Sequence, residues 1–164
     1  MWRKMERSDL ARVSALSDLV HGRFTERPEI YAERLALCPD GCFVHDRSGR
    51  IDGYLISHPW RRFDPPPLDR ELGGLPGEAG CWYLHDLALS PEARGSGAGA
   101  AAVDLVLAHA REAGFAEISL VAVNGAESFW ESRGFQRIET RALSENLASY
   151  GPGAFYMARA LTGG

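Results

Sequence analysis

One short glycine-rich segment of the chain lies between an expected strand and an expected helix, which is where an anion-binding turn would occur. It contains, in order, Arg94, Gly95, Ser96, Gly97, Ala98 and Gly99. Residues 82–89, just before it, have the apolar character of a strand, and the residues after it, up to about 113, repeat apolar side chains at helical spacing. A strand, a tight turn and a helix in this order bring unpaired backbone N–H groups and the positive end of the helix dipole to one point. We therefore expect a diphosphate or a similar anion to bind this turn.

Two other nucleotide-binding loops have similar glycines, and the flanking residues argue against both. A Walker A loop ends in Gly-Lys-Ser/Thr, and no lysine follows these glycines. Gly95, Gly97 and Ala100 match the loose dinucleotide fingerprint, but the next strand, which ends near Asn124, has no acidic residue to hold a ribose. Close helix packing is a further explanation for Gly99, because this residue lies on the apolar stripe of the helix.

Length and composition restrict the possible functions. The chain has 164 residues, enough for one domain with its own core, and its 18 basic residues are scattered in a protein of net charge -4. Nucleic acid needs clustered positive charge, so we expect no such partner. No apolar run is long enough to cross a bilayer, so we expect a cytoplasmic protein without a membrane segment. Cys38, Cys42 and Cys81 lack metal-ligand spacing, so we expect reduced thiols and no metal.

The elements that would position the turn follow from periodicity. Helices are expected at residues 8–21 and 28–37 and, with Asn124 as the cap, at 124–133. Strands are expected at 42–45 and 51–57, joined by a glycine turn, and at 118–123, 136–142 and 154–161. Residues 59–80 contain five prolines and no periodicity, so they should form a long loop, either a wall of the binding site or a tolerated insertion.

The turn and its surroundings resemble the GNAT acyltransferase superfamily. Residues 94–99 look like the Arg/Gln-x-x-Gly-x-Gly/Ala signature of that family, and residues 87–91 resemble the hydrophobic strand and proline before it. The segment after the next strand is similar to the family's helix-to-strand junction at Asn124, Ala126, Phe129, Trp130, Gly134 and Phe135. The resemblance is specific over residues 82–135. It implies an α+β fold in which one domain, residues 1–164, has a mixed, mostly antiparallel sheet of about seven strands and about four helices.

The resemblance also implies how acetyl-CoA would bind. The N–H groups of residues 94–99 would hold the diphosphate, and the exposed main chain of Leu87, Ala88 and Leu89 would pair with the pantetheine arm as an added strand does. This requires that the strands at 82–89 and 118–123 separate at their carboxyl ends. Asn124 and Trp130 fall near cofactor-contacting positions of the family. The spacing after Asn124 is one residue shorter than usual, so helix capping is the other role for this residue.

The reaction also needs a general base, because an alkylammonium has a pKa of about 10 and must lose a proton before it attacks a thioester. By resemblance, His85 stands where aralkylamine acetyltransferases have a histidine and polyamine acetyltransferases a glutamate. A histidine hydrogen-bonded within the core is the alternative. Strand alternation would place Tyr83 on the face of His85, as a substrate contact or a packed aromatic, and Asp86 on the opposite face. We expect the other histidines at the surface, namely His21, His45, His58 and His109.

One position departs from the family pattern. Many members have a tyrosine four residues before the glycine of the Gly-Phe pair, where it protonates the departing thiolate, and this chain has Trp130 there. An indole N–H is a poor acid. A thiolate can leave without help, since the pKa of a thiol is about 8.5, so the change predicts a slower reaction and not its loss. Tyr150 and Tyr156, from the last hairpin, are the candidate catalytic acids in its place.

The function implied by the resemblance is acetyl-CoA-dependent transfer of an acetyl group to a primary amine, with a small molecule as the acceptor. Two alternatives stay open. Trp130 suits a catalytically silent acyl-CoA-binding module, and an open acceptor groove would suit acetylation of protein α-amines or lysines. By analogy with the family, the final strands are candidates for a homodimer interface. No motif identifies the amine.

Overall fold

Seven strands form one mixed sheet in the computed structural model, which describes residues 1–161. Their order in the sheet is β1-β2-β3-β4-β5-β7-β6, and every neighbouring pair is antiparallel except β4 and β5, which are parallel. The strands are β1 (Trp2–Lys4), β2 (Cys42–Arg47), β3 (Arg50–Trp60), β4 (Cys81–Leu89), β5 (Glu117–Ala122), β6 (Gln136–Arg137) and β7 (Phe155–Ala160). The predicted α+β class and the mostly antiparallel seven-stranded sheet are confirmed.

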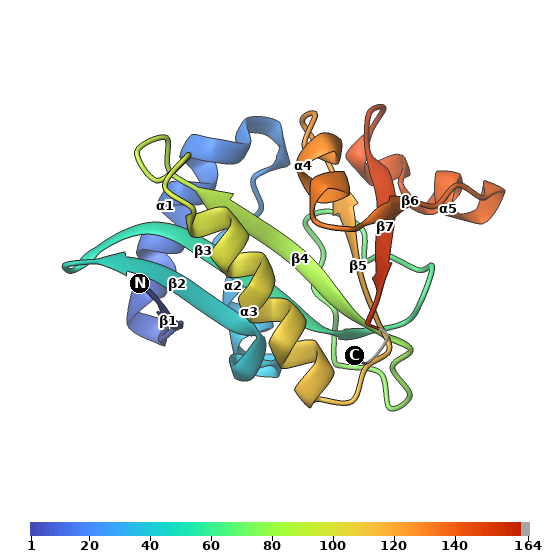
Figure 1. The fold of residues 1–164 in the computed structure, drawn as a ribbon, viewed down its shortest axis with the longest axis horizontal. Helices are drawn as coiled ribbons and strands as arrows, with labels where there is room; N and C mark the ends of the chain where they lie inside the picture. Colours follow the sequence, from blue (N-terminus) through green and yellow to red (C-terminus); the bar gives the residue numbers. More distant parts are fainter. Residues whose placement is uncertain (162–164) are drawn as a thin grey trace.

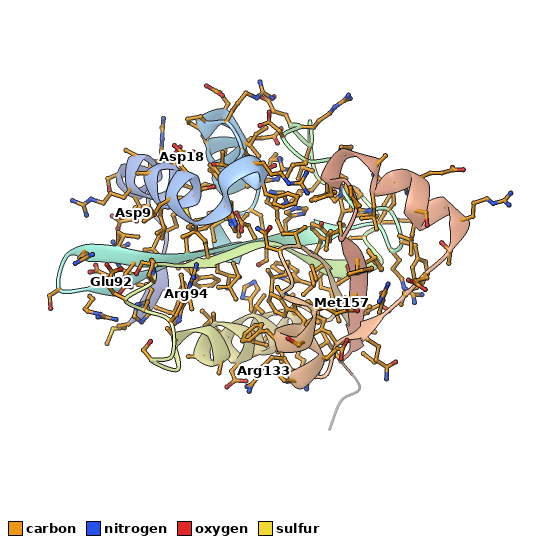
Figure 2. All side chains as sticks on the ribbon, turned by 90° about the horizontal axis from the view of Figure 1, so that it is seen from above. Asp9, Asp18, Glu92, Arg94, Arg133 and Met157 are labelled. Carbon is orange, nitrogen blue, oxygen red and sulfur yellow. The ribbon has the colours of Figure 1, made fainter. Side chains whose placement is uncertain are left out.

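Helices cover both faces of this sheet (Figure 2). One face carries α1 (Leu10–His21) and α2 (Pro28–Leu37), and the other carries α3 (Ala98–Glu112) and α4 (Glu127–Ser132). The stripe expected on α3 is buried against β4 and β5, with Val103 and Val106 at its centre. A fifth helix, α5 (Arg141–Asn146), adds one to the number expected. No helix within the described residues is both long and apolar enough to cross a bilayer.

The β2–β3 hairpin turns at two residues with positive φ, Ser48 at 54° and Gly49 at 89°. Two such residues are typical of a type I′ turn, whose twist matches that of the strands it joins. The hairpin was predicted, but both strands are longer than expected, and β3 continues through Pro59 to Trp60. The loop that follows therefore covers residues 61–80, close to the predicted 59–80.

Two sequence predictions near the carboxyl end were wrong. The strand expected at 136–142 is limited to Gln136–Arg137, because Thr140 begins α5: its side chain accepts a hydrogen bond from the backbone N–H of Leu143. Asn124, which was expected to cap the next helix, makes no such capping hydrogen bond with any residue that the structure describes. There α4 begins only at Glu127, its N-cap is Ala126, and Asn124 has a φ of 55°, a left-handed conformation that asparagine tolerates.

The sheet opens between β4 and β5. Only three residue pairs join these strands, ending at Leu84 and Leu120, and beyond them the strands diverge (Figure 1). Main-chain groups of β4 that point toward β5 after Leu84 therefore have no partner strand in the described part of the chain. This is the separation at the carboxyl ends that the acetyl-CoA arrangement requires.

A β-bulge interrupts β4 at the same level. Ile56 of β3 pairs with Asp86 and Ser57 pairs with Leu84, so His85 is an extra residue in the ladder. An extra residue breaks the alternation of side chains, because two consecutive residues then oppose one on the neighbouring strand. His85 and Asp86 therefore both lie on the α1/α2 side of the sheet. The expectation that they face opposite sides was wrong for this reason.

Candidate active site

The glycine-rich turn joins β4 to α3 and ends at Gly97, the residue that caps the helix with a φ of 89°. Gly95 has a φ of 78°, and the space where a Cβ would stand is open at both glycines. Within residues 1–161, no acceptor binds the backbone N–H of Gly95, Gly97 or Gly99. Trp2 fixes this end of the helix by donating its indole N–H to the carbonyl of Ala98 at 3.0 Å. The turn therefore presents free donors on an open surface.

Gly99 differs from the other two glycines. It is buried, and an added Cβ would meet the side chains of Leu89 at 3.4 Å and Phe129 at 3.5 Å. Close packing of α3 against β4 and α4 accounts for this glycine. Its free N–H still lies in the first turn of the helix, where donors have no intrahelical acceptor.

A cavity of about 220 Å³ passes through the opening between β4 and β5. On one face of the sheet its wall comes from the end of α1, the α1–α2 connection and the loop after β3. On the other face it comes from α4 and the end of β5, and Arg94 of the turn lies at its edge. The lining residues are Val20, His21, Phe24, Glu26, Leu68, Leu84, His85, Asp86, Leu87, Arg94, Leu120, Val121, Val123, Asn124, Ala126, Trp130 and Tyr150.

Two histidine–carboxylate pairs lie on the α1/α2 side of this cavity. Nε2 of His85 is 2.6 Å from Oε1 of Glu26, and only 2% and 3% of these side chains are exposed. Nδ1 of His85 is buried without a hydrogen-bond partner among residues 1–161. The ring therefore has one nitrogen fixed by a carboxylate and one nitrogen free.

The second pair is His21 and Asp86, with Nε2 and Oδ1 separated by 2.7 Å. The other oxygen of Asp86 accepts a hydrogen bond from the hydroxyl of Tyr54 at 2.6 Å. Burial alone would lower the pKa of His21, but the charge of Asp86 and the hydrogen bond to it raise this pKa above its usual value. Burial opposes ionisation of Asp86 in turn, and His21 together with the other partners brings the pKa of this carboxyl below its usual value. The two groups thus form an ion pair.

The remaining histidines are not the surface residues that were expected. His58 is 1% exposed, and burial lowers its pKa to about 3, so it is neutral. Its ring lies 6.3 Å from that of His85. Nδ1 of His45 is 2.6 Å from the buried carboxylate of Asp52. His109 packs edge-on against Trp82, with ring centroids 4.9 Å apart.

Aromatic residues proposed for the site occupy three different places. Tyr150 lines the cavity and donates its hydroxyl to the carbonyl of Pro66 at 3.1 Å. Tyr83 is 1% exposed and does not reach the cavity wall; its hydroxyl has no partner in the described residues. Tyr156 lies in a second cavity of about 440 Å³ formed with α5, where its hydroxyl accepts a hydrogen bond from the backbone N–H of Phe63. Of these tyrosines, only Tyr150 shares the cavity with His85.

Trp130 lines the opposite side of the cavity and is 7% exposed. It packs edge-on against Phe129 and Phe135, with ring centroids 5.0 and 5.3 Å away. Asn124 lies on the same side of the opening. The structure therefore brings together four residues of the sequence motif from four successive segments: Leu87 of β4, Arg94 of the turn, Asn124 after β5 and Trp130 of α4.

Sequence reasoning did not find Glu26 or assign a role to His21. His21 is the last residue of α1, and Glu26 lies in the connection between α1 and α2, a segment without any motif. Glu26 contacts His85 of β4, 59 residues away in sequence, and His21 contacts Asp86, 65 residues away. Their signal was local: polar residues at the end of an amphipathic helix, just before the proline that begins the next one. That pattern locates a helix boundary but not the strand against which it packs.

Comparisons with known proteins agree with this geometry. Residues 10–135 match the model of the Acetyltransferase (GNAT) family. Among curated proteins, no significant match to the sequence was found. Many solved structures match the fold.

Three of those structures have different functions in their descriptions and a similar fold. The GphF GNAT-like decarboxylase in complex with isobutyryl-CoA has a TM-score of 0.81 at 17% identity, over 98% of this chain and 99% of that one. The loading GNATL domain of CurA from Lyngbya majuscula has a TM-score of 0.80 at 15% identity, over 98% and 97%. The ribosomal-protein-S18-alanine N-acetyltransferase from Escherichia coli has a TM-score of 0.70 at 16% identity, over 100% and 95%. Because the family model covers most of the sequence, this chain belongs to the GNAT family of acetyltransferases.

Proposed function

We propose that this protein transfers the acetyl group of acetyl-CoA to the primary amine of a small molecule. One observation carries the proposal: a single cavity extends from Arg94, at the start of the turn with the free N–H groups, through the opening of the sheet to the histidine–carboxylate pairs. The diphosphate of the donor would bind the turn, where backbone donors and the helix dipole favour an anion. The pantetheine arm would then lie along β4 after Leu84, where the main chain lacks a partner strand.

The chemistry would take place beside His85. A primary ammonium loses a proton to Nδ1 of this histidine, through a water molecule because Nδ1 is buried. The neutral amine attacks the thioester carbonyl carbon, and a carbon–nitrogen bond forms. The carbon–sulfur bond then breaks, the nitrogen loses its second proton to solvent to give the neutral amide, and the released thiolate of CoA takes up a proton to give the thiol. Tyr150 is the phenol that lines this cavity, so we assign it the role of donor to the thiolate.

Electrostatics favour a cationic acceptor. Glu26 and Asp86 place two carboxylates on the wall, and His21 offsets the charge of Asp86, so Glu26 is the carboxylate that faces the acceptor without a protonated partner. Among the described lining residues the only arginine or lysine is Arg94, at the end near the turn. A small acceptor is favoured because residues 61–80 fold over this side and contribute Leu68 to the wall. An acceptor on a protein chain would need a more open groove.

The test is an assay of thiol release over a panel of primary amines, with the amide product identified by mass spectrometry. We expect turnover with at least one amine and a loss of about 100-fold or more in His85→Gln, at unchanged affinity for acetyl-CoA. Tight binding of acetyl-CoA without transfer to any amine would support a silent binding module instead. Because a GNAT-like decarboxylase has a similar fold, a malonyl-type thioester belongs in the panel, and release of CO₂ from it would contradict the proposal.

A further inference from the structure

Glu26 connects the proposed base to the long loop after β3. Its Oε1 lies 2.6 Å from Nε2 of His85, and its Oε2 accepts a hydrogen bond of 2.8 Å from the backbone N–H of Asp69. The residue is only 5% exposed. Both oxygens of one buried carboxylate are thus occupied, one by β4 and the other by the loop at residues 61–80.

The contact with His85 determines where the ring carries its proton. A carboxylate only accepts hydrogen bonds, so Nε2 must be the N–H of the neutral ring. The lone pair then lies on Nδ1, which no group in the described chain binds. A neutral histidine can otherwise adopt either tautomer, and the partner of one nitrogen decides the state of the other. Glu26 therefore selects the tautomer in which Nδ1 can accept a proton.

The contact with the loop depends on a backbone conformation that is held in place. Asp69 has a φ of 60°, which residues other than glycine rarely adopt. Arg27 donates three hydrogen bonds to Asp69. Its backbone N–H and Nε donate to the carboxylate at 2.8 and 3.1 Å, and its terminal nitrogen donates to the backbone carbonyl at 2.9 Å. This arrangement aims the N–H of Asp69 at Glu26.

We propose that Glu26 is the positioning residue for His85 and that the loop at residues 61–80 acts on acetyl transfer through it. The carboxylate fixes the tautomer of His85, and the N–H of Asp69 fixes the carboxylate. Release of the loop would leave Glu26 free to rotate and the ring free to change tautomer. The inference rests on the proposed function, because it assumes that His85 takes the proton of the acceptor.

The first test reads the ring nitrogens directly and needs no substrate. Long-range 1H–15N NMR distinguishes a protonated from an unprotonated ring nitrogen, and His85→Gln assigns the signals. We expect the Nε2–H tautomer in the wild type and a mixture of tautomers in Glu26→Gln, which keeps the size of the side chain but removes its charge. An unchanged tautomer in Glu26→Gln, or a wild type already mixed, would overturn the proposal.

The second test is kinetic. We expect Glu26→Gln to lower kcat by about 100-fold while KM for acetyl-CoA stays within about threefold, because the cofactor turn is untouched. Arg27→Ala should lower kcat by about 10-fold, because it removes the two side-chain hydrogen bonds that hold Asp69 and leaves only the one from the backbone N–H. Arg61→Ala is the matched control: it removes an exposed ion pair with Asp64 in the same loop without contact to Glu26.

Equal effects of Arg27→Ala and Arg61→Ala on kcat would contradict the role of the loop. Circular dichroism and melting temperatures show whether each variant is folded. If the wild type acetylates no amine, the proposed function fails, while the NMR result still decides whether Glu26 positions His85. The two failures are therefore distinguishable.

Discussion

His21 and Asp86 form an ion pair of 2.7 Å on the wall of the cavity, 65 residues apart in sequence. The pKa of His21 is raised, so in the folded protein the ring keeps its proton to higher pH than in the unfolded chain. Its contribution to the free energy of unfolding is complete below the unfolded value of about 6.5 and is lost as the pH rises through the folded value. This pair closes the α1 side of the cavity, and its two charges offset each other.

The charge of the acceptor space predicts which amines are rejected. An amine and its α-carboxylated counterpart, such as 2-phenylethylamine and phenylalanine, differ only by a carboxylate. That group would face the carboxylate of Glu26 without a free cation to pair with, because the charge of His21 is already paired with Asp86 and Arg94 lies toward the cofactor turn. We expect kcat/KM to be at least about 100-fold lower for the amino acid. Measurement over several such pairs tests this, and equal values would show that the acceptor does not lie beside Glu26.

Gly97 and Gly49 offer a matched test of the cofactor turn. Both have a φ of 89° and open space at the Cβ position. Alanine at either position should lower the free energy of unfolding by about 1 kcal/mol, because of the left-handed backbone. Only Gly97→Ala should also weaken binding of acetyl-CoA, by about 10-fold or more, since its methyl group would stand where the diphosphate approaches. Calorimetric titration of both variants decides the matter, and equal affinities would move the binding site elsewhere.

Tyr150 and Tyr156 allow the proposed thiolate donor to be tested with an internal control. Burial and the charge of Glu26 raise the pKa of Tyr150, so its hydroxyl keeps its proton throughout the assay range. Burial also raises the pKa of Tyr156, but this residue lies in the other cavity. Each phenylalanine variant should lose about 1 kcal/mol of stability with its hydrogen bond. We expect Tyr150→Phe alone to lower kcat, by about 10-fold. A larger effect of Tyr156→Phe would reverse the assignment.

The buried, neutral His58 should make the free energy of unfolding depend on pH in acid. Its folded pKa of about 3 lies below that of an unfolded histidine, so on acidification the unfolded chain takes up a proton that the folded protein does not. The free energy of unfolding should therefore fall by about 1.4 kcal/mol per pH unit below about pH 6.5 from this residue. In His58→Gln the decline should be shallower by that amount. Urea titrations from about pH 7 to pH 4 measure it, with His109→Gln as the control; parallel curves for wild type and His58→Gln would contradict it.

Local signals were sufficient to predict the turn and the helix of the proposed cofactor site. The turn near Gly97 was predicted because glycine, strand and helix follow one another in sequence, and the buried stripe of α3 follows from its 3.6-residue period. The strand expected at 136–142 failed because one hydrogen bond from Leu143 to Thr140 decides between strand and helix there. Short segments of this kind are decided by single contacts that periodicity does not report.

The acceptor half depended on relationships that no local pattern encodes. His85 was proposed as the base from its position in the family motif, but its partner Glu26 comes from a connection without a motif. Asp86 was assigned to the wrong face because the prediction assumed regular alternation, and the bulge at His85 adds one residue. A bulge depends on the register with β3, which is a tertiary property.

The hydrogen bond from Tyr150 to Pro66 has a consequence for biosynthesis. The anion-binding turn and α3 are complete well before the ribosome adds Tyr150, whereas the acceptor wall needs this residue and the loop that it holds. The wall of the cavity is therefore complete only once the chain has been synthesised as far as Tyr150.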